Sequence, residues 1–190
     1  KNLGAARGSG TTVYFHPDPT IFPKVEFDPA VIRERLEIVS YLHKGVKVTF
    51  ENCPMIFSRN EWPAGNNIAW SPYIWRRIIE QWGGTIGLNY DPSHLVWLMI
   101  DQERFIREFG PHILHFQAKD VQIDRDGLYE RGSMSAGIGW QIPRLPGLGD
   151  ANWAEIFSNL YRVGYDGDCI IEHEDRHFEA TDQLIKRGFI

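Results

Sequence analysis

Four short segments of the chain have apolar residues on one face and polar residues on the other when they are drawn as extended strands. In such a strand successive side chains point to opposite faces, so positions i and i+2 share a face. The polar face of each segment carries an oxygen- or nitrogen-bearing residue at its C-terminal end. The pattern predicts four strands, which span residues 46–51, 86–91, 113–119 and 168–172.

Helix signals lie between these strands. Asp28 is placed to cap a helix that has Pro29 at its first position and ends before Gly45, because Asp is a preferred N-cap and Gly a preferred stop. Ser71-Pro72 opens a second helix, which ends at Gly83-Gly84. Further helices are predicted over residues 101–109, 152–163 and the C-terminal stretch to Ile190, with one more strand at residues 11–15 and a long loop at 120–150. Strands that alternate with such helices are typical of parallel β/α units.

The predicted fold class is α/β, in the form of a (β/α)8 TIM barrel. A barrel of parallel strands gathers the C-terminal strand ends around one pocket, which explains why four strands end in polar residues. The chain has five predicted β/α units in 190 residues, whereas a full barrel takes about 250 residues. We therefore expect a single domain, residues 1–190, that holds about strands 4 to 8 and lacks roughly three N-terminal units. An open sheet of five units is the alternative.

Composition limits the classes of partner and the cellular location that we expect for the protein. The net charge of −5 gives no basic face of the kind that binds nucleic acid, so no nucleic-acid partner is expected. No apolar run is long enough to span a bilayer, and the N-terminal residues lack the core of a signal peptide. Cys53 and Cys169 make no disulfide framework and are expected to be reduced and partly buried, which favours a cytoplasmic location. An incomplete barrel leaves strand edges open, so a partner chain, such as a second copy in a homo-oligomer, or a further segment is expected to cover them.

Sequence motifs accompany the ends of the predicted strands. They are Glu51-Asn52-Cys53-Pro54-Met55, then residues 87–95 (GLNYDPSHL), 115–120 (HFQAKD) and 171–175 (IEHED). In this order they resemble the xylose-isomerase-like sugar phosphate isomerase/epimerase superfamily, including its D-tagatose 3-epimerase-like and hydroxypyruvate isomerase-like enzymes. The resemblance covers nearly all of the chain. The Asp-Pro-Ser-His segment and the order of the motifs are its specific parts, whereas a glutamate at a strand end alone is not specific.

The resemblance implies a (β/α)8 barrel that holds one divalent cation, most often Mn²⁺ or Mg²⁺, with Co²⁺ or Zn²⁺ as further options. Carried over by position, it makes Glu51, Asp91 and Glu172 metal ligands. The fourth ligand of the family is a histidine, but Gln117 stands at that position here. The neutral amide oxygen of a glutamine suits a hard cation such as Mn²⁺ or Mg²⁺ better than Zn²⁺. His115 would replace Gln117 only if the strand slipped, because it lies one pleat deeper.

The family chemistry is the isomerisation or C3 epimerisation of a sugar or sugar-derived small molecule. It moves a proton next to a carbonyl, so a cation would stabilise the enediolate and two carboxylates would act as base and acid. The resemblance assigns these catalytic roles to Glu51 and Glu172. His94, three residues after Asp91, is expected to contact a substrate oxygen. Further substrate-binding candidates are His115, Lys119 and Arg144.

Three other functions compete with this hypothesis. A lyase or dehydratase acting on keto-sugars, inososes or keto-glycosides would use the same base and cation to expel a group β to the carbonyl. An apurinic-site endonuclease, also related by fold, needs a histidine-rich zinc cluster and a basic face, which the seven histidines and the net charge of −5 do not provide. The third alternative is a degenerate barrel that binds a ligand without catalysis. Only Gln117, at the position of the family's histidine ligand, favours it.

Each candidate residue also has an ordinary structural explanation when it is considered alone. A glutamate at a strand end is more often a solvated loop residue, and Asp91 before Pro92 is common in turns. Lys119 and Arg144 can simply pair with neighbouring acids. Trp140, in a glycine-rich segment that is expected to cover the pocket mouth, favours function more than the other tryptophans do. Only the ordered set of strand ends favours a functional site.

Overall fold

The computed structural model describes residues 28, 30–31, 34–35, 38, 47–54, 67–133 and 139–189. The chain divides into two compact units, Lys1–Lys44 and Gly45–Ile190. In the first unit, the described residues between 30 and 38 are helical, and Asp28 Oδ1 accepts a hydrogen bond from the N–H of Ala30 at 2.8 Å. Asp28 is therefore confirmed as the start of the predicted helix. The strand predicted at residues 11–15 and the end of that helix lie outside the described residues.

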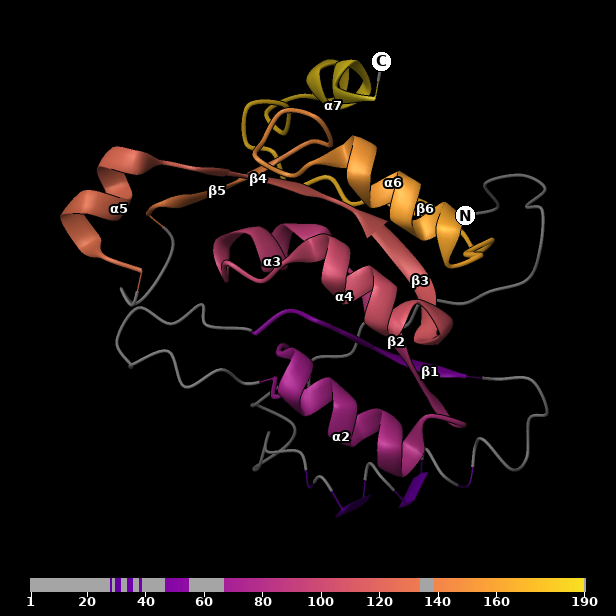
Figure 1. The fold of residues 1–190 in the computed structure, drawn as a ribbon. Coiled ribbons are helices and arrows are strands. Elements are labelled where there is room, and N and C mark those ends of the chain that lie inside the picture. The colour runs from indigo at the N-terminus through magenta and orange to yellow at the C-terminus, as the bar shows by residue number, and fades with distance from the viewer. Residues whose placement is uncertain are drawn as a thin grey trace, which may run out of the picture. The chain divides into compact units, whose positions relative to one another are not determined.

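The second unit contains a four-stranded parallel sheet (Figure 1). Its strands are β1 Val48–Glu51, β2 Ile86–Tyr90, β3 Ile113–Ala118 and β6 Cys169–Ile171, in the order β1-β2-β3-β6. These are the four strands that the alternating pattern predicts. Helices connect the successive strands of this sheet, so the prediction of parallel β/α units is confirmed.

Helices accompany the strands, and some of them lie along the sheet (Figure 1). Those of the second unit are α2 Pro72–Trp82, α3 Pro92–Trp97, α4 Gln102–Phe109, α5 Arg125–Arg131, α6 Trp153–Arg162 and α7 Asp182–Gly188, with a 3-10 turn at Gly110–His112. In Figure 1, α2, α4 and α6 run in similar directions along the sheet. Ser71 and Asp101 cap α2 and α4, because their side-chain oxygens accept hydrogen bonds from N–H groups of the first turn.

An aromatic core fills the space between the sheet and its helices. The side chains of Leu88, Tyr90 and Phe116 are fully buried. The ring of Tyr90 stacks on Phe105 and on Phe116, with centroids 5.7 Å apart in both pairs. Burying a large apolar side chain is worth roughly 1.5–3 kcal/mol. Since Tyr90 is the last residue of β2, this core also anchors the backbone that leads into Asp91.

The parallel register brings the polar strand ends to one edge of the sheet. Glu51 is the last residue of β1, Asp91 directly follows β2, and Glu172 directly follows β6. Gln117 is one residue before the end of β3, where it pairs with Ile170 of β6. Because the strands are parallel, their C-terminal ends lie at the same edge. This is the convergence that the sequence predicts.

More than half of the described residues in the segment predicted as a long loop, 120–150, belong to strands or a helix. β4 Asp120–Ile123 and β5 Gln141–Arg144 form an antiparallel pair, and α5 follows β4. The loop prediction was wrong because both strands are short and β5 contains Pro143, a residue that weakens a strand signal. Helix α3 was also missed, since Asp91 before Pro92 was interpreted as a turn.

The two cysteines differ in exposure. Cys53 is buried just after β1, whereas Cys169 is exposed at the start of β6. The expectation that both are partly buried was therefore wrong for Cys169. Within the described part of the chain, β6 lies at one edge of the sheet, which leaves its residues open to solvent.

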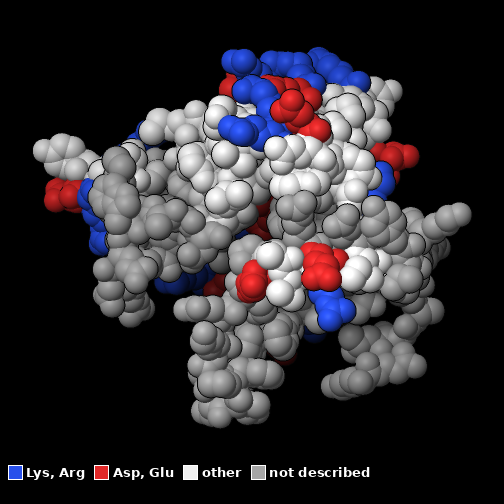
Figure 2. Space-filling model, turned by 90° about the horizontal axis from the view of Figure 1, so that it is seen from below, with Lys and Arg blue, Asp and Glu red and all other residues white. Residues whose placement is uncertain are grey.

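The described surface carries both signs of charge. On the face shown in Figure 2, basic side chains gather at the upper edge with acidic side chains beside them. None of the helices among the described residues combines the length and apolar character that crossing a membrane requires.

Candidate active site and metal centre

Asn52 joins the end of β1 to the end of β2. Its Nδ2–H donates to the backbone oxygen of Asp91 at 2.8 Å, and its Oδ1 accepts from the N–H of Asp91 at 2.7 Å. Its side chain is fully buried, so these two bonds are not exchanged for bonds to water. The reciprocal pair holds Asp91 beside Glu51, the residue that precedes Asn52.

Three of the predicted ligands lie together at this edge of the sheet. Glu51, Asp91 and Glu172 each offer a carboxylate oxygen, and these oxygens lie within 4.8 Å of one another. Asp91 is fully buried, and it also accepts a hydrogen bond from the N–H of Ser93 at 2.8 Å, which starts α3. Carboxylates this close repel one another unless positive charge lies between them. The arrangement is therefore one that a cation stabilises.

Lys119 supplies positive charge to the same carboxylates. Its Nζ lies 3.0 Å from Asp91 Oδ2, 3.0 Å from Glu172 Oε2 and 3.2 Å from Glu174 Oε2. Burial by itself lowers the pKa of Lys119, but the three carboxylates outweigh burial and raise the pKa well above its ordinary value. Its ammonium group is therefore committed to ion pairs within the protein, and the role expected for it in substrate binding stays a prediction.

The pKa values of Asp91 and Glu172 move in opposite directions. Burial alone would raise the pKa of Asp91, but His94, Lys119 and the N–H of Ser93 outweigh it and lower the pKa to about 2. Burial also raises the pKa of Glu172, and here the opposing charge of Lys119 is too weak to reverse the shift. Asp91 therefore stays ionised, whereas Glu172 is the better proton acceptor of the two.

His94 lies on α3, and its ring contacts two of the carboxylates. Its Nε2 is 3.0 Å from Glu51 Oε1 and 3.2 Å from Asp91 Oδ2. Burial by itself lowers the pKa of His94, but the charge of Asp91 and hydrogen bonds with Asp91, Cys53 and Glu51 raise it well above its ordinary value. His94 therefore contacts two predicted ligands directly, and the substrate contact expected for it stays a prediction.

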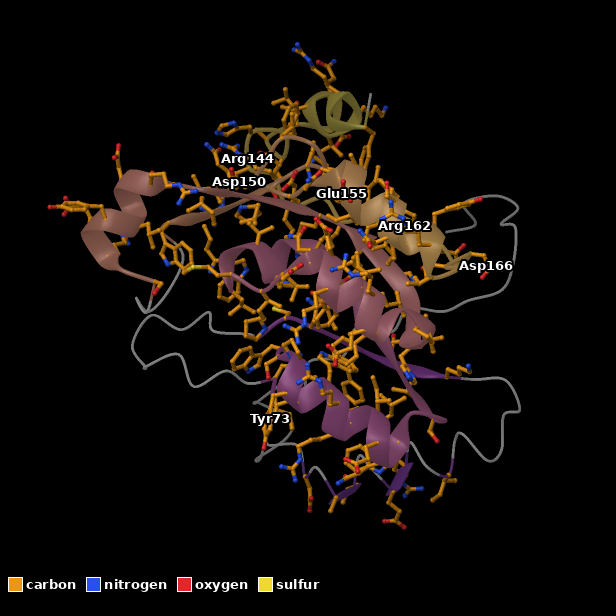
Figure 3. All side chains as sticks on the ribbon, viewed as in Figure 1. Tyr73, Arg144, Asp150, Glu155, Arg162 and Asp166 are labelled. Carbon is orange, nitrogen blue, oxygen red and sulfur yellow. The ribbon has the colours of Figure 1, made fainter. Side chains whose placement is uncertain are left out.

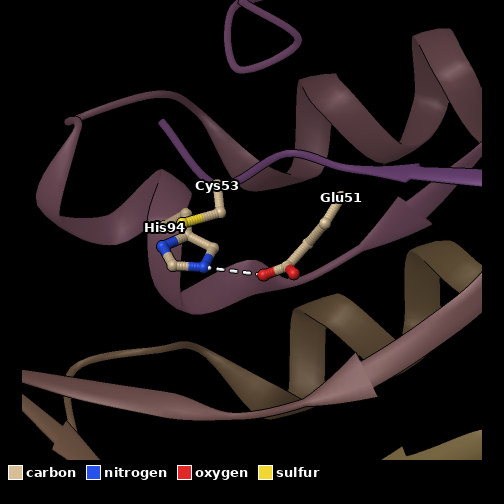
Figure 4. Close-up of side chains that lie close together, drawn as sticks. All are labelled: Glu51, Cys53 and His94. Atoms are coloured by element: carbon tan, nitrogen blue, oxygen red, sulfur yellow. Dashed lines mark hydrogen bonds and ion pairs between the residues drawn. The ribbon is translucent and has the colours of Figure 1, made fainter. Parts of the chain in front are cut away.

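A second group of ligand atoms includes a thiol. Cys53, His94 and Glu51 each offer one such atom, and these lie within 4.8 Å of one another. Figure 4 shows the sulfur of Cys53 beside the His94 ring, with the dashed contact from His94 to Glu51. The sequence singled out Cys53 only as a reduced, partly buried thiol. Its position two residues after Glu51 was the available signal.

Gln117 and His115 have different surroundings on β3. The side-chain oxygen of Gln117 is buried and has no hydrogen-bond partner within the described part of the chain. An unpaired buried oxygen is costly, and a cation would satisfy it. His115 pairs with Asn89 of β2 and belongs to neither group of potential ligand atoms found among the described residues. The structure therefore gives His115 no support as the alternative ligand.

Arg144 is occupied by protein partners. Its Nε–H and Nη2–H donate to Gln122 Oε1 at 3.0 and 2.7 Å. Its Nη1 lies 3.3 Å from Asp175 Oδ1 and 3.0 Å from His177 Nδ1. Figure 3 labels Arg144, which lies on β5. These contacts brace β5 against the segment after β6, so the substrate-binding role expected for Arg144 has no structural support and stays a prediction.

An open pocket of about 700 Å³ lies in front of the carboxylates. Predicted site residues that line it are Glu51, His94, Lys119 and Glu172. Residues 139 and 141–143, from the segment expected to cover the mouth, also line it. Trp140 itself is buried beside Trp97 with ring centroids 6.1 Å apart. Its indole therefore contributes to packing and not to the pocket wall.

Three charged pocket residues and one anchor were not predicted. Glu174, Arg176 and Glu179 line the pocket, two, four and seven residues after Glu172. Asp120 fixes the segment after β5, because its carboxylate accepts hydrogen bonds from the N–H groups of residues 147, 149 and 151 at 3.0 Å each. The glycine-rich composition of residues 147–149 hinted at such an anchor but did not identify the acceptor.

Comparison with known proteins identifies one family over most of the chain. The family model described as xylose isomerase-like TIM barrel matches residues 5–189. The uncharacterized protein YfiH of Bacillus subtilis (strain 168) is 33% identical over 118 residues, which are 58% of this chain and 38% of YfiH. The crystal structure of a xylose isomerase domain protein from Planctomyces limnophilus has a TM-score of 0.54 at 17% identity, and the match covers 92% of this chain and 55% of that chain.

Shorter matches involve a different class of protein. A subunit of DNA topoisomerase 4 from Mycoplasma genitalium is 44% identical over 50 residues, which are 26% of this chain and 8% of that protein. DNA gyrase from Thermotoga maritima and from Thermus thermophilus gives matches of similar length. The chain thus spans a small part of these relatives and less than two thirds of YfiH and of the solved structure.

The family model covers well over half of the chain, and the solved structure has the same fold. Four parallel strands, their helices and the polar residues at the strand ends agree with this match. The chain belongs to the xylose isomerase-like TIM barrel family.

Proposed function

We propose that this site is that of a divalent-cation-dependent sugar isomerase or epimerase. The observation that carries the proposal is the convergence of Glu51, Asp91 and Glu172, with oxygens within 4.8 Å of one another beside an open pocket. Pockets for small molecules typically measure about 300–1,000 Å³, so one of about 700 Å³ is large enough for a sugar.

The donor set fits a hard divalent cation. Glu51, Asp91 and Glu172 would hold it through carboxylate oxygens, and Gln117 would add its unpaired amide oxygen. All four donors are oxygens, the ligands that Mn²⁺ and Mg²⁺ prefer. When bound, such a cation polarises the substrate carbonyl and stabilises the negative charge that develops on its oxygen.

Glu172 and Glu51 are suited to move the proton. The raised pKa of Glu172 makes this carboxylate the stronger base, so it takes the proton next to the substrate carbonyl. Glu51 is half-buried and accepts a hydrogen bond from His94 at Oε1, and its carboxylate would exchange a proton with the neighbouring carbon as well as hold the cation. Proton removal and return by these two groups interconvert an aldose and a ketose, or two epimers.

Hydrogen exchange in heavy water tests this proposal. The Mn²⁺-loaded protein is incubated with a panel of ketoses and aldoses, and NMR follows deuterium entering the position next to the carbonyl. We expect exchange and isomer formation, with a loss of about 100-fold or more in Glu172→Gln. Glu130→Gln, at an exposed position on α5, is the control and retains the activity.

Two results would change this assignment. An unsaturated or dehydrated product would assign a lyase to the same base and cation. Absence of both Mn²⁺ binding and exchange with every sugar tested would contradict the proposed function.

The short topoisomerase and gyrase matches do not alter this proposal. The match to the Mycoplasma genitalium protein covers 8% of that protein and 26% of this chain, too little to carry its activity. The family model, by contrast, spans residues 5–189 and so includes every carboxylate of the proposed site. The proposal therefore rests on the barrel family and on the geometry of the strand ends.

A further inference from the structure

Trp97 lies directly behind His94 on one face of α3. Its indole Nε1–H donates a hydrogen bond to Nδ1 of His94 at 3.3 Å. The two rings meet edge to face, with centroids 6.1 Å apart. Both side chains are buried. Residues three apart in a helix share a face, so α3 itself holds the two rings together.

The other nitrogen of the His94 ring faces the carboxylates. Nε2 lies 3.0 Å from Glu51 Oε1 and 3.2 Å from Asp91 Oδ2. An indole N–H can only donate, so in this contact Nδ1 accepts and the ring hydrogen is on Nε2. Trp97 therefore favours the neutral ring and opposes the carboxylates, which raise the pKa of His94. His94 is therefore held between one donor behind it and carboxylate acceptors in front of it.

We propose that Trp97 is a positioning residue for Glu51 and acts through His94. The indole N–H fixes the orientation of the His94 ring, and the ring aims its Nε2–H at Glu51 Oε1. Without that N–H the ring is free to turn, and the carboxylate loses its fixed direction. The inference rests on the proposed role of Glu51 as a cation ligand.

The size of the effect follows from what such partners contribute elsewhere. Side chains that orient metal ligands typically contribute about 10- to 100-fold to metal affinity. Trp97 acts one step farther out than His94, so we expect its loss to weaken Mn²⁺ binding by about 10-fold, the lower end of that range.

Trp140 provides a matched control. It is buried in the same cluster, with its ring edge-on to Trp97 at 6.1 Å between centroids. Its Nε1 has no hydrogen-bond partner among the described residues. Trp140→Phe therefore removes the same volume and the same kind of N–H as Trp97→Phe without touching His94.

Mn²⁺ titrations of the full chain, followed by calorimetry, test the proposal. Trp97→Phe is expected to raise the dissociation constant by about 10-fold, and Trp140→Phe to change it by less than about twofold. In a His94→Gln background the Gln amide still offers an N–H to Glu51, but the hydrogen bond to Trp97 is lost. Trp97→Phe should therefore cause no further rise in the dissociation constant in this background. An equal loss in both backgrounds, or an equal loss in Trp140→Phe, would overturn the proposal.

Nitrogen-15 NMR of labelled protein provides a readout that does not need the metal. The Nδ1 resonance of His94 should shift in Trp97→Phe and stay unchanged in Trp140→Phe. If Trp97→Phe does not fold, benzothienylalanine at position 97 keeps the two-ring shape and removes the N–H. If the wild type binds no Mn²⁺, the proposed metal centre fails, and an unchanged Nδ1 resonance would then separately overturn the role of Trp97.

Discussion

The Nζ atom of Lys119 lies 3.0 Å from Oδ2 of Asp91, and both side chains are buried. The same ammonium group reaches Glu172 at 3.0 Å. Lys119 therefore neutralises two of the carboxylates that the proposed cation would also bind. Lys119 is a covalently attached source of positive charge for these carboxylates, and the proposed cation would be an exchangeable one.

Replacing Lys119 by Met should destabilise the cation-free protein. Removing one partner of a buried ion pair typically costs about 3–5 kcal/mol, because the remaining charge stays buried and unpaired. We expect a loss of this size in the free energy of unfolding, measured by urea denaturation in the presence of EDTA. Saturating Mn²⁺ should recover part of it by mass action. Lys186→Met, at an exposed position on α7, is the control and should change stability little.

The lowered pKa of Asp91 predicts a loss of stability in acid. A carboxyl group with a pKa of about 2 in the folded state and 3.8 in the unfolded state binds fewer protons when folded. Its stabilisation is therefore complete above about pH 4 and is lost as the pH falls through about 2, and it amounts to roughly 2 kcal/mol. Urea denaturation of the metal-free protein between these pH values should show this fall. Asp91→Asn should lack it, whereas Asp166→Asn, an exposed control, should retain it.

Gln117 should determine which cation the site prefers. Gln117→Leu removes the unpaired amide oxygen and should weaken Mn²⁺ binding by about 10-fold, on the order of the loss of one supporting group in a metal site. Gln117→His supplies an imidazole, which should favour Co²⁺ and Zn²⁺ over Mg²⁺. Competition titrations with Mn²⁺, Mg²⁺, Co²⁺ and Zn²⁺ measure both effects. Unchanged affinities in both variants would show that Gln117 lies outside the metal site.

The ends of β1, β2 and β3 were predictable because each lies in a segment with a period of two, whereas the end of β6 follows the continuous apolar run Cys169–Ile171. The apolar face of β2 gives Leu88 and Tyr90, which are fully buried, and the next polar position is Asp91. Relations between side chains were not predictable in the same way. No local pattern indicates that Lys119 pairs with Asp91 or that Arg144 pairs with Asp175, since these contacts depend on the register of distant strands.

Helix α3 illustrates a signal that was present but assigned to another structure. Asp91 followed by Pro92 starts both turns and helices, because Asp is a good N-cap and Pro is favoured at the first helical position. The helix brings the rings of His94 and Trp97 into contact, since it places both on one face. Because the segment was interpreted as a turn, the contact between His94 and Trp97 was not predicted.

Asp120 should be the main anchor of the segment after β5. Its Oδ2 accepts from the N–H groups of Gly147 and Gly149 and from Trp153 Nε1 at 2.7 Å. In Asp120→Asn one oxygen becomes an NH₂ group that faces these donors, so we expect a loss of about 2–4 kcal/mol in the free energy of unfolding. Asp150→Asn, whose carboxylate accepts one hydrogen bond from Ile123, should cost less. Equal losses in the two variants, measured by urea denaturation, would contradict the anchoring role.

The division into two compact units predicts that residues 45–190 keep the site without residues 1–44. The side chains of the site, from Glu51 to Glu174, all belong to the second unit. A chain that begins at Gly45 should therefore unfold in one cooperative transition and bind Mn²⁺ within about threefold of the full chain, since it retains every predicted ligand and the described partners of each. Calorimetric titration of both chains measures this. A shortened chain that folds but binds Mn²⁺ far more weakly would show that the first unit supports the metal centre.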